Sequence, residues 1–99
     1  MKKKLDPIHP GEILLEEFMK PLDLSINALS RELHVPPNRI HAIVNGSRGI
    51  SADTALRLGV YFGVSPGTWL TLQMEYDLRS AQRDIGPEVA RTVRRREAA

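Results

Sequence analysis

Apolar residues recur at helical spacing in a short block that begins at Ile26 and continues through Leu29 and Leu33. Ser25 directly precedes the block, and a serine at that position commonly caps a helix by accepting a hydrogen bond from a backbone N–H. The pattern predicts a short helix that begins after Ser25 and turns these apolar side chains toward a core.

A second apolar block follows after a break at residues 34–36. Pro37 stands at a first-turn position, where a helix tolerates proline, and Gly46 follows the block as a C-terminal cap. The inward-facing residues of this block are Ile40, Ile43 and Val44. Two short helices joined by a turn of about three to four residues form a helix-turn-helix unit, whose second helix can enter the major groove of DNA. Residues 25–48 are therefore predicted to form such a unit.

The remaining apolar positions also recur with a helical period, and no segment alternates as a strand does. Three further helices are predicted over residues 9–20, 51–63 and about 65–81, with His9, Ser51 and Ser65 as their caps. The residues expected to face inward are Ile13, Leu14, Phe18, Leu22, Ala55, Leu58 and Phe62. Together with the helix-turn-helix, these segments predict an all-α domain of five helices joined by short loops.

The chain length of 99 residues fits one domain with a modest core. The absence of cysteine excludes a disulfide framework and a thiolate metal site. No apolar run approaches the length of a membrane span, and the three N-terminal lysines precede no apolar signal core. We expect a soluble cytoplasmic protein with a flexible basic segment at 1–7, the helical domain at 8–84 and a basic tail at 85–99.

Charge is distributed unevenly along the chain. Residues 5–78 carry five basic against nine acidic side chains, whereas residues 79–99 carry six arginines against three acidic groups. Within the acidic central part, basic residues gather at and just beyond the second helix of the helix-turn-helix. Such clustering is typical of a surface that binds nucleic acid, although chance scatter of solvated charges is the simpler alternative.

The outward positions of that second helix carry amide, guanidinium, imidazole and methyl groups, and none is acidic. The amide of Asn38 can pair with adenine in a bidentate way, and Arg39 can contact guanine or phosphate. The residues predicted to contact DNA are Ser25, Asn27, Pro37, Asn38, Arg39, His41, Ala42, Asn45 and Arg48. Capping alone would account equally well for Ser25, and Asn45 could end the helix, contact phosphate, or do both.

The last helix carries an aromatic and apolar stripe that is too large for a chain of this length to bury completely. Part of this face is expected to belong to the core and part to a dimer interface, because large exposed apolar patches on small domains usually mark association. The predicted dimer residues are Trp69, Leu70, Gln73 and Tyr76.

Enzymatic chemistry finds no support in the sequence. His9, His34 and His41 lack a metal-ligand spacing, no Ser-His-Asp or Cys-His arrangement is suggested, and no glycine-rich phosphate loop follows a strand. We therefore expect neither catalytic activity nor a cofactor.

Several segments resemble the HigA/VapI-type antitoxins, which belong to the lambda-repressor-like (XRE) group of DNA-binding domains. They are HPGEILLEEF at 9–18, the helix-turn-helix at 25–48, GISADTALRLGVYFG at 49–63 and WLTLQMEYDLRSA at 69–81. The resemblance covers about residues 8–82. It implies a five-helix fold, a homodimer that binds a palindromic operator in the promoter of its own operon, and neutralisation of a small ribonuclease toxin similar to RelE and HigB. A stand-alone phage-type repressor and a protein-interaction module that no longer binds DNA remain alternatives.

Two residues depart from the usual pattern of this group. His34 occupies the turn, where glycine is common because the backbone tends to be left-handed; histidine is enriched in that region, so the cost is on the order of 1 kcal/mol. Ser30 stands where alanine is usual and is still small enough for two helices to approach closely. Neither residue argues against the fold.

A cluster of acidic residues lies near the beginning of the chain. Its members are Glu12, Glu16, Glu17 and Asp23. By default such a cluster is a solvated face, but it could also attract a basic toxin, because complementary charges steer encounter.

Overall fold

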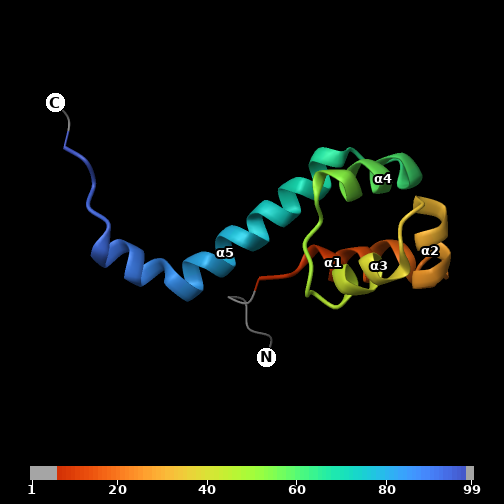
Figure 1. Ribbon diagram of the computed structural model, residues 1–99, viewed down its shortest axis with the longest axis horizontal. Coiled ribbons are helices and arrows are strands. Elements are labelled where there is room, and N and C mark those ends of the chain that lie inside the picture. Colours follow the sequence, from red (N-terminus) through yellow and green to blue (C-terminus); the bar gives the residue numbers. More distant parts are fainter. Residues whose placement is uncertain (1–6, 98–99) are drawn as a thin grey trace.

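The computed structural model describes residues 7–97, which contain helices and no strand. The helices are α1 (Pro10–Ile13), the π-helix η1 (Leu14–Met19), α2 (Ile26–Leu33), α3 (Pro37–Val44), α4 (Ala52–Phe62) and α5 (Pro66–Thr92). Helices α1 to α4 gather on one side, and α5 runs away from them (Figure 1). Because η1 directly continues α1, the two form one helical segment, and the prediction of an all-α domain with five helices is confirmed. The basic segment predicted at 1–7 lies, apart from Pro7, outside the described residues.

Four polar side chains cap the helices as the sequence predicts. His9 accepts from the N–H of Gly11 at 2.8 Å, Ser25 from Ala28 at 3.0 Å, Ser51 from Thr54 at 3.3 Å and Ser65 from Gly67 at 3.2 Å. Each cap satisfies a backbone donor that the first turn of a helix leaves without a partner. The sequence therefore marks where these helices begin with good accuracy.

The first predicted helix has two unexpected features. After α1 it continues as η1, in which the N–H of Lys20 bonds to the carbonyl of Leu15, five residues back. The helix still ends just before Pro21, as predicted. Leu22 lies beyond that end and is 60% exposed, so its predicted place in the core is wrong.

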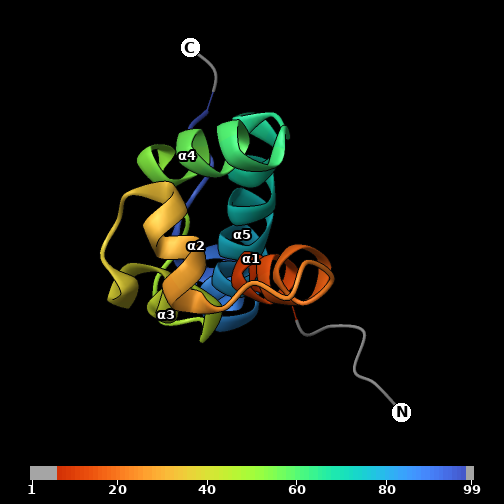
Figure 2. The same ribbon diagram turned by 90° about the vertical axis from the view of Figure 1, so that its right-hand side faces the viewer.

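The turn between α2 and α3 has the geometry that its sequence implies. His34 has φ 59° and ψ 46°, which places it in the left-handed region, and Gly46 after α3 has φ 85°. The hydroxyl of Ser30 is buried and donates to the carbonyl of Ile26 at 2.7 Å, so this small polar residue is satisfied within its own helix. Figure 2 shows α2 between α3 on one side and α4 on the other.

One core joins all of the helices. Its buried apolar residues include Leu14, Met19, Leu29, Leu33, Ile40, Ile43, Ala55, Leu58 and Trp69. The ring of Phe18 lies 5.0 Å from that of Phe62 and 4.9 Å from that of Trp69. Trp69 is only 1% exposed, so the beginning of α5 is fixed to the body of the domain.

Helix α5 passes through the predicted tail boundary. Residues 85–92 are helical, although Gly86 and Pro87 suggest a stop. Proline lacks an N–H and its ring crowds the preceding turn, so a proline inside a helix either bends or ends it. Here the helix continues on both sides of Pro87, so the proline bends it. Figure 1 shows this bend in the C-terminal part of α5. Helix α5 therefore continues beyond the boundary predicted at residue 84 and ends at Thr92.

Candidate nucleic-acid interface

The first turns of α2 and α3 face each other across an open groove of about 470 Å³. Its lining consists of Ser25, Ile26, Asn27, Pro37, Asn38 and His41. Five of the nine residues predicted to contact DNA thus come together in one place, although they come from two helices. The side chains of Asn27, Asn38 and His41 are exposed there, and no acidic residue lines the groove.

The chemistry of this groove depends on side chains more than on backbone donors. Pro36 and Pro37 begin α3 and have no N–H groups, and no side chain caps this helix. Among the described residues the side chain of Asn38 makes no hydrogen bond, so its amide is free to take a partner. Ser25 already accepts a hydrogen bond as the cap of α2, but its hydroxyl hydrogen remains available to donate.

Arg39 points away from the groove toward α4. Its Nη1 lies 2.7 Å from Oδ1 of Asp53, and its side chain is 22% exposed. The same carboxyl oxygen also accepts from Nε of Arg57 at 2.7 Å. These hydrogen bonds, from Arg57 first and then from Arg39, hold the pKa of the Asp53 carboxyl below its usual value. The structure therefore places Arg39 at the edge of α3, in a three-residue ion-pair network.

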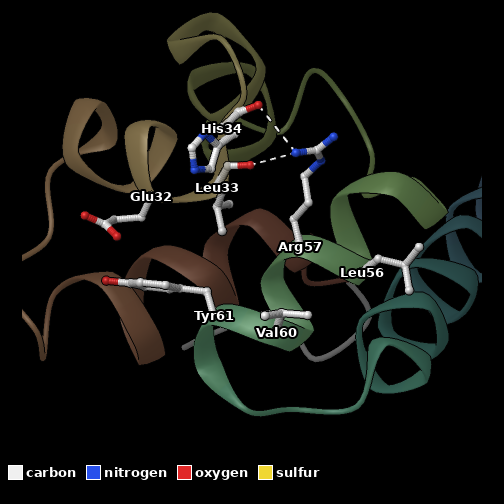
Figure 3. A pocket seen from close by; sticks show the side chains of 7 residues that line it. All are labelled: Glu32, Leu33, His34, Leu56, Arg57, Val60 and Tyr61. Atoms are coloured by element: carbon white, nitrogen blue, oxygen red, sulfur yellow. Dashed lines mark hydrogen bonds between the residues drawn. The ribbon is translucent and has the colours of Figure 1, made fainter.

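Arg57 extends this network to the helix-turn-helix itself. Its Nη1 donates to the backbone carbonyls of Leu33 at 2.9 Å and His34 at 3.4 Å (Figure 3). These carbonyls belong to the end of α2 and to the left-handed turn, so Arg57 fixes the angle at which α3 leaves α2. Arg57 also lines a second groove, of about 350 Å³, with Glu32, Leu56, Val60 and Tyr61.

Sequence reasoning did not find the roles of Asp53 and Arg57. Their spacing of four residues within one predicted helix is a visible signal for an ion pair. The link from Asp53 to Arg39 joins residues far apart in the chain, and no local pattern indicates it.

The loop after α3 is tied back onto that helix. Oδ1 of Asn45 accepts from the backbone N–H of Ser47 at 3.0 Å and from its hydroxyl at 2.7 Å. The carbonyl of Ala42 accepts from the N–H groups of Ser47 at 3.0 Å and Arg48 at 3.2 Å. Asn45 therefore organises the end of the helix, one of the two roles considered for it, and Arg48 is left exposed in the loop.

The four predicted dimer residues lie in different environments. Trp69 is buried in the core, so its assignment to an interface between chains is wrong; its large apolar ring fills the space beside Phe18 instead. Gln73 and Tyr76 are partly buried against their own chain, whereas Leu70 is 38% exposed. A helical stripe in the sequence cannot reveal which of its members the rest of the fold covers.

His9, the cap of α1, also contacts α5. The rings of His9 and Tyr76 meet edge to face at 4.7 Å. Burial lowers the pKa of His9, and the nearby carboxylate of Asp77 offsets part of this effect. A neutral imidazole fits the role of its Nδ1 as acceptor for Gly11, because a protonated Nδ1 could not accept.

Residues 7–97 contain neither a cluster of metal ligands nor a membrane span. Nowhere in this range do three or more His, Asp or Glu side chains gather closely enough to hold a metal ion. None of the helices in it has the length and apolar character needed to cross a membrane.

Comparisons with known proteins show the family to which the chain belongs. The helix-turn-helix family model matches residues 15–69, more than half of the chain. Virulence-associated protein I of Dichelobacter nodosus is 54% identical over 83 residues, which cover 84% of this chain and 77% of that protein.

Two solved structures that contain DNA are also similar. Antitoxin GraA in complex with its operator aligns with a TM-score of 0.89 and 43% identity, over 99% of each chain. Pseudomonas aeruginosa antitoxin HigA with the higBA promoter aligns with a TM-score of 0.87 and 45% identity, over 89% of this chain and 96% of that one. The chain therefore belongs to the helix-turn-helix family of DNA-binding domains and, within it, to the HigA/VapI-type antitoxins.

Proposed function

We propose that this protein binds a palindromic operator as a homodimer, represses its own operon, and neutralises a small basic ribonuclease toxin similar to HigB. The groove between the first turns of α2 and α3 carries the proposal, because it presents exposed amide, hydroxyl and imidazole groups from a helix-turn-helix. The two similar antitoxins solved with operator or promoter DNA support operator binding by this chain.

The residues proposed to contact DNA divide into those that read bases and those that contact the phosphate backbone. Asn38, in the first turn of α3, takes the base-reading role, because a free amide can bond adenine in a bidentate way. Asn27 and Ser25 at the start of α2, together with Arg48 in the loop after α3, contact phosphates. The remaining members of the proposed DNA surface are Pro37, Arg39, His41, Ala42 and Asn45.

The dimer uses an exposed apolar seam on α5. Its members recur mostly every four residues: Leu70, Met74, Leu78, Ile85 and Val89 in α5, and Val93, which directly follows the helix. Between 38% and 65% of each is exposed, although apolar seams of this length on a projecting helix are normally covered by another chain. A second copy related by a two-fold axis would bring two recognition helices to half-sites about 34 Å apart, one turn of B-DNA.

The toxin partner is proposed from similarity to antitoxins, and a neighbouring gene for a small basic protein would support it. A stand-alone repressor remains the alternative if no such gene exists. Acidic groups such as Glu12 and Glu17 are exposed on the first helical segment, away from the groove, and suit a basic partner.

The experiment measures binding of the purified protein to its own upstream DNA by fluorescence anisotropy, against a duplex of the same composition in shuffled order. We expect preferential binding of two chains per palindrome, with the stoichiometry determined by analytical ultracentrifugation. Co-expression with the neighbouring gene product tests the antitoxin role, through co-purification and through rescue of growth. Equal affinity for the two duplexes would refute operator recognition, and failure to rescue growth would leave only the repressor role.

A further inference from the structure

The loop that carries Arg48 is held at both of its ends. At its beginning, Asn45 accepts two hydrogen bonds from Ser47. At its end, the backbone N–H of Ile50 donates to Oε1 of Gln73 at 2.7 Å. Gln73 belongs to α5, so this second attachment joins the loop after the recognition helix to the helix proposed to form the dimer.

The amide of Gln73 is fixed in one orientation by its own helix. Its Nε2 donates to Oδ1 of Asp77 at 2.9 Å, one turn further along α5. Because an aspartate carboxylate only accepts hydrogen bonds, it selects the amide orientation that turns Oε1 toward Ile50. Asp77 therefore acts on the loop through Gln73.

Glycine at position 49 leaves room for this contact. A Cβ atom at Gly49 would lie 2.9 Å from Cδ of Gln73, closer than real Cβ atoms approach their neighbours. Any larger residue would displace the amide from Ile50. The small residue beside Arg48 is thus explained by the approach of the α5 side chain.

We propose that Gln73, oriented by Asp77, is a positioning residue that holds the loop so that Arg48 meets the DNA backbone. The inference rests on the proposed function, and it assigns to α5 a second task besides dimerisation. Without the hydrogen bond from Ile50, the loop would have to be ordered when DNA binds, and this loss of conformational freedom would oppose binding. The affinity for the operator is therefore set partly by a residue that does not touch DNA.

Two measurements on the full chain test the proposal. Hydrogen exchange of the Ile50 amide should accelerate in Gln73→Ala and stay unchanged in Thr68→Ala, which removes an exposed side chain from the same helix. Gln73→Ala should lower operator affinity roughly fivefold or more when it is made in the parent protein, but should lower it little further when it is added to Arg48→Ala, because residues that act through one contact are not additive. Thr68→Ala should bind as the parent does.

A swap of functional groups tests the orienting role of Asp77. Gln73→Glu keeps an acceptor for Ile50 but sets two carboxylates against each other, so it should weaken operator binding. Combining it with Asp77→Asn lets the amide at position 77 donate to the carboxylate at position 73, the reverse of the parent's hydrogen bond. This double variant should recover most of the lost operator affinity.

Three results would overturn the proposal. The first is an Ile50 amide that exchanges in Gln73→Ala as slowly as in the parent. The second is a loss of operator affinity from Gln73→Ala that is equally large in the parent and in Arg48→Ala. The third is a Gln73→Ala protein that binds DNA more weakly because sedimentation shows that it no longer dimerises. A parent that does not prefer its operator would instead refute the proposed function, and the exchange measurement would still report whether Gln73 holds the loop.

Discussion

Replacing Asn38 by alanine should separate DNA recognition from folding. The side chain is exposed in the first turn of α3, lines the groove, and makes no hydrogen bond within residues 7–97. Its removal therefore breaks no side-chain hydrogen bond or ion pair within residues 7–97. Surface substitutions of this kind change the free energy of unfolding by about 0.5 kcal/mol or less, so the thermal midpoint should be almost unchanged.

The expected loss of affinity is much larger. One bidentate pair between an amide and adenine contributes about 1–3 kcal/mol of discrimination. A dimer carries two copies of Asn38, so the loss should be about 2–6 kcal/mol per operator. Since about 1.4 kcal/mol corresponds to a tenfold change in Kd, the operator affinity should fall between roughly 30-fold and about 10⁴-fold.

The assay is fluorescence anisotropy on the operator and on a shuffled duplex, at one fixed salt concentration. Asn27→Ala is the matched control, because it makes the same chemical change in the same groove at a residue proposed to contact phosphate. It should weaken binding to both duplexes alike, whereas Asn38→Ala should reduce the ratio of the two affinities. If Asn38→Ala leaves that ratio intact, α3 does not read bases through its first turn and the recognition surface is assigned wrongly.

Three further outcomes follow from the same contacts. Ser25→Ala removes the cap of α2 and should lower the free energy of unfolding by about 1 kcal/mol, as measured by denaturant titration; an unchanged midpoint would contradict the capping role. Leu70→Asp and Val89→Asp should each shift the sedimentation profile toward a monomer that keeps its helical circular dichroism, and persistence of the dimer in both would exclude the α5 seam. Burial lowers the pKa of His9, so the unfolded chain binds more protons below about pH 6.5 and stability should decline as the pH falls through that value. His9→Asn keeps a capping acceptor and should flatten this decline, a comparison made by denaturant titration at about pH 7.5 and about pH 5.5.

Local chemistry made most of the fold predictable from the sequence. Helix beginnings depend on nearby residues, and the caps at Ser25, Ser51 and Ser65 lie where the pattern indicates. The left-handed turn at His34 could be predicted for the same reason, since its backbone conformation is a property of a few adjacent residues. The end of α5 could not, because whether a proline ends a helix or bends it depends on the stability of the turns on both sides.

The candidate site was predictable only in part. Residues on the outward face of a single helix share a periodic pattern, and the groove brings together those from the first turns of α2 and α3. The attachments that orient the recognition helix and its loop join residues distant in the chain. Arg39 meets Asp53 of α4, and Ile50 meets Gln73 of α5. A single sequence contains no periodic signal for such pairs, because they arise only when the helices pack.

Helix α5 has two apolar stripes, one that faces the core and one that stays exposed, and the sequence pattern alone does not distinguish them. Successive residues turn by about 100° around a helix, so the stripe through Trp69 and Tyr76 lies beside the stripe through Leu70, Met74 and Leu78. The fold covers the first stripe with the aromatic core and with His9. The second stripe stays exposed and continues past the bend into the part of α5 that projects from the body (Figure 1). Burial of the first stripe therefore leaves the second stripe as the face proposed for the dimer, one helical face away from Gln73, which is proposed to hold the loop after α3.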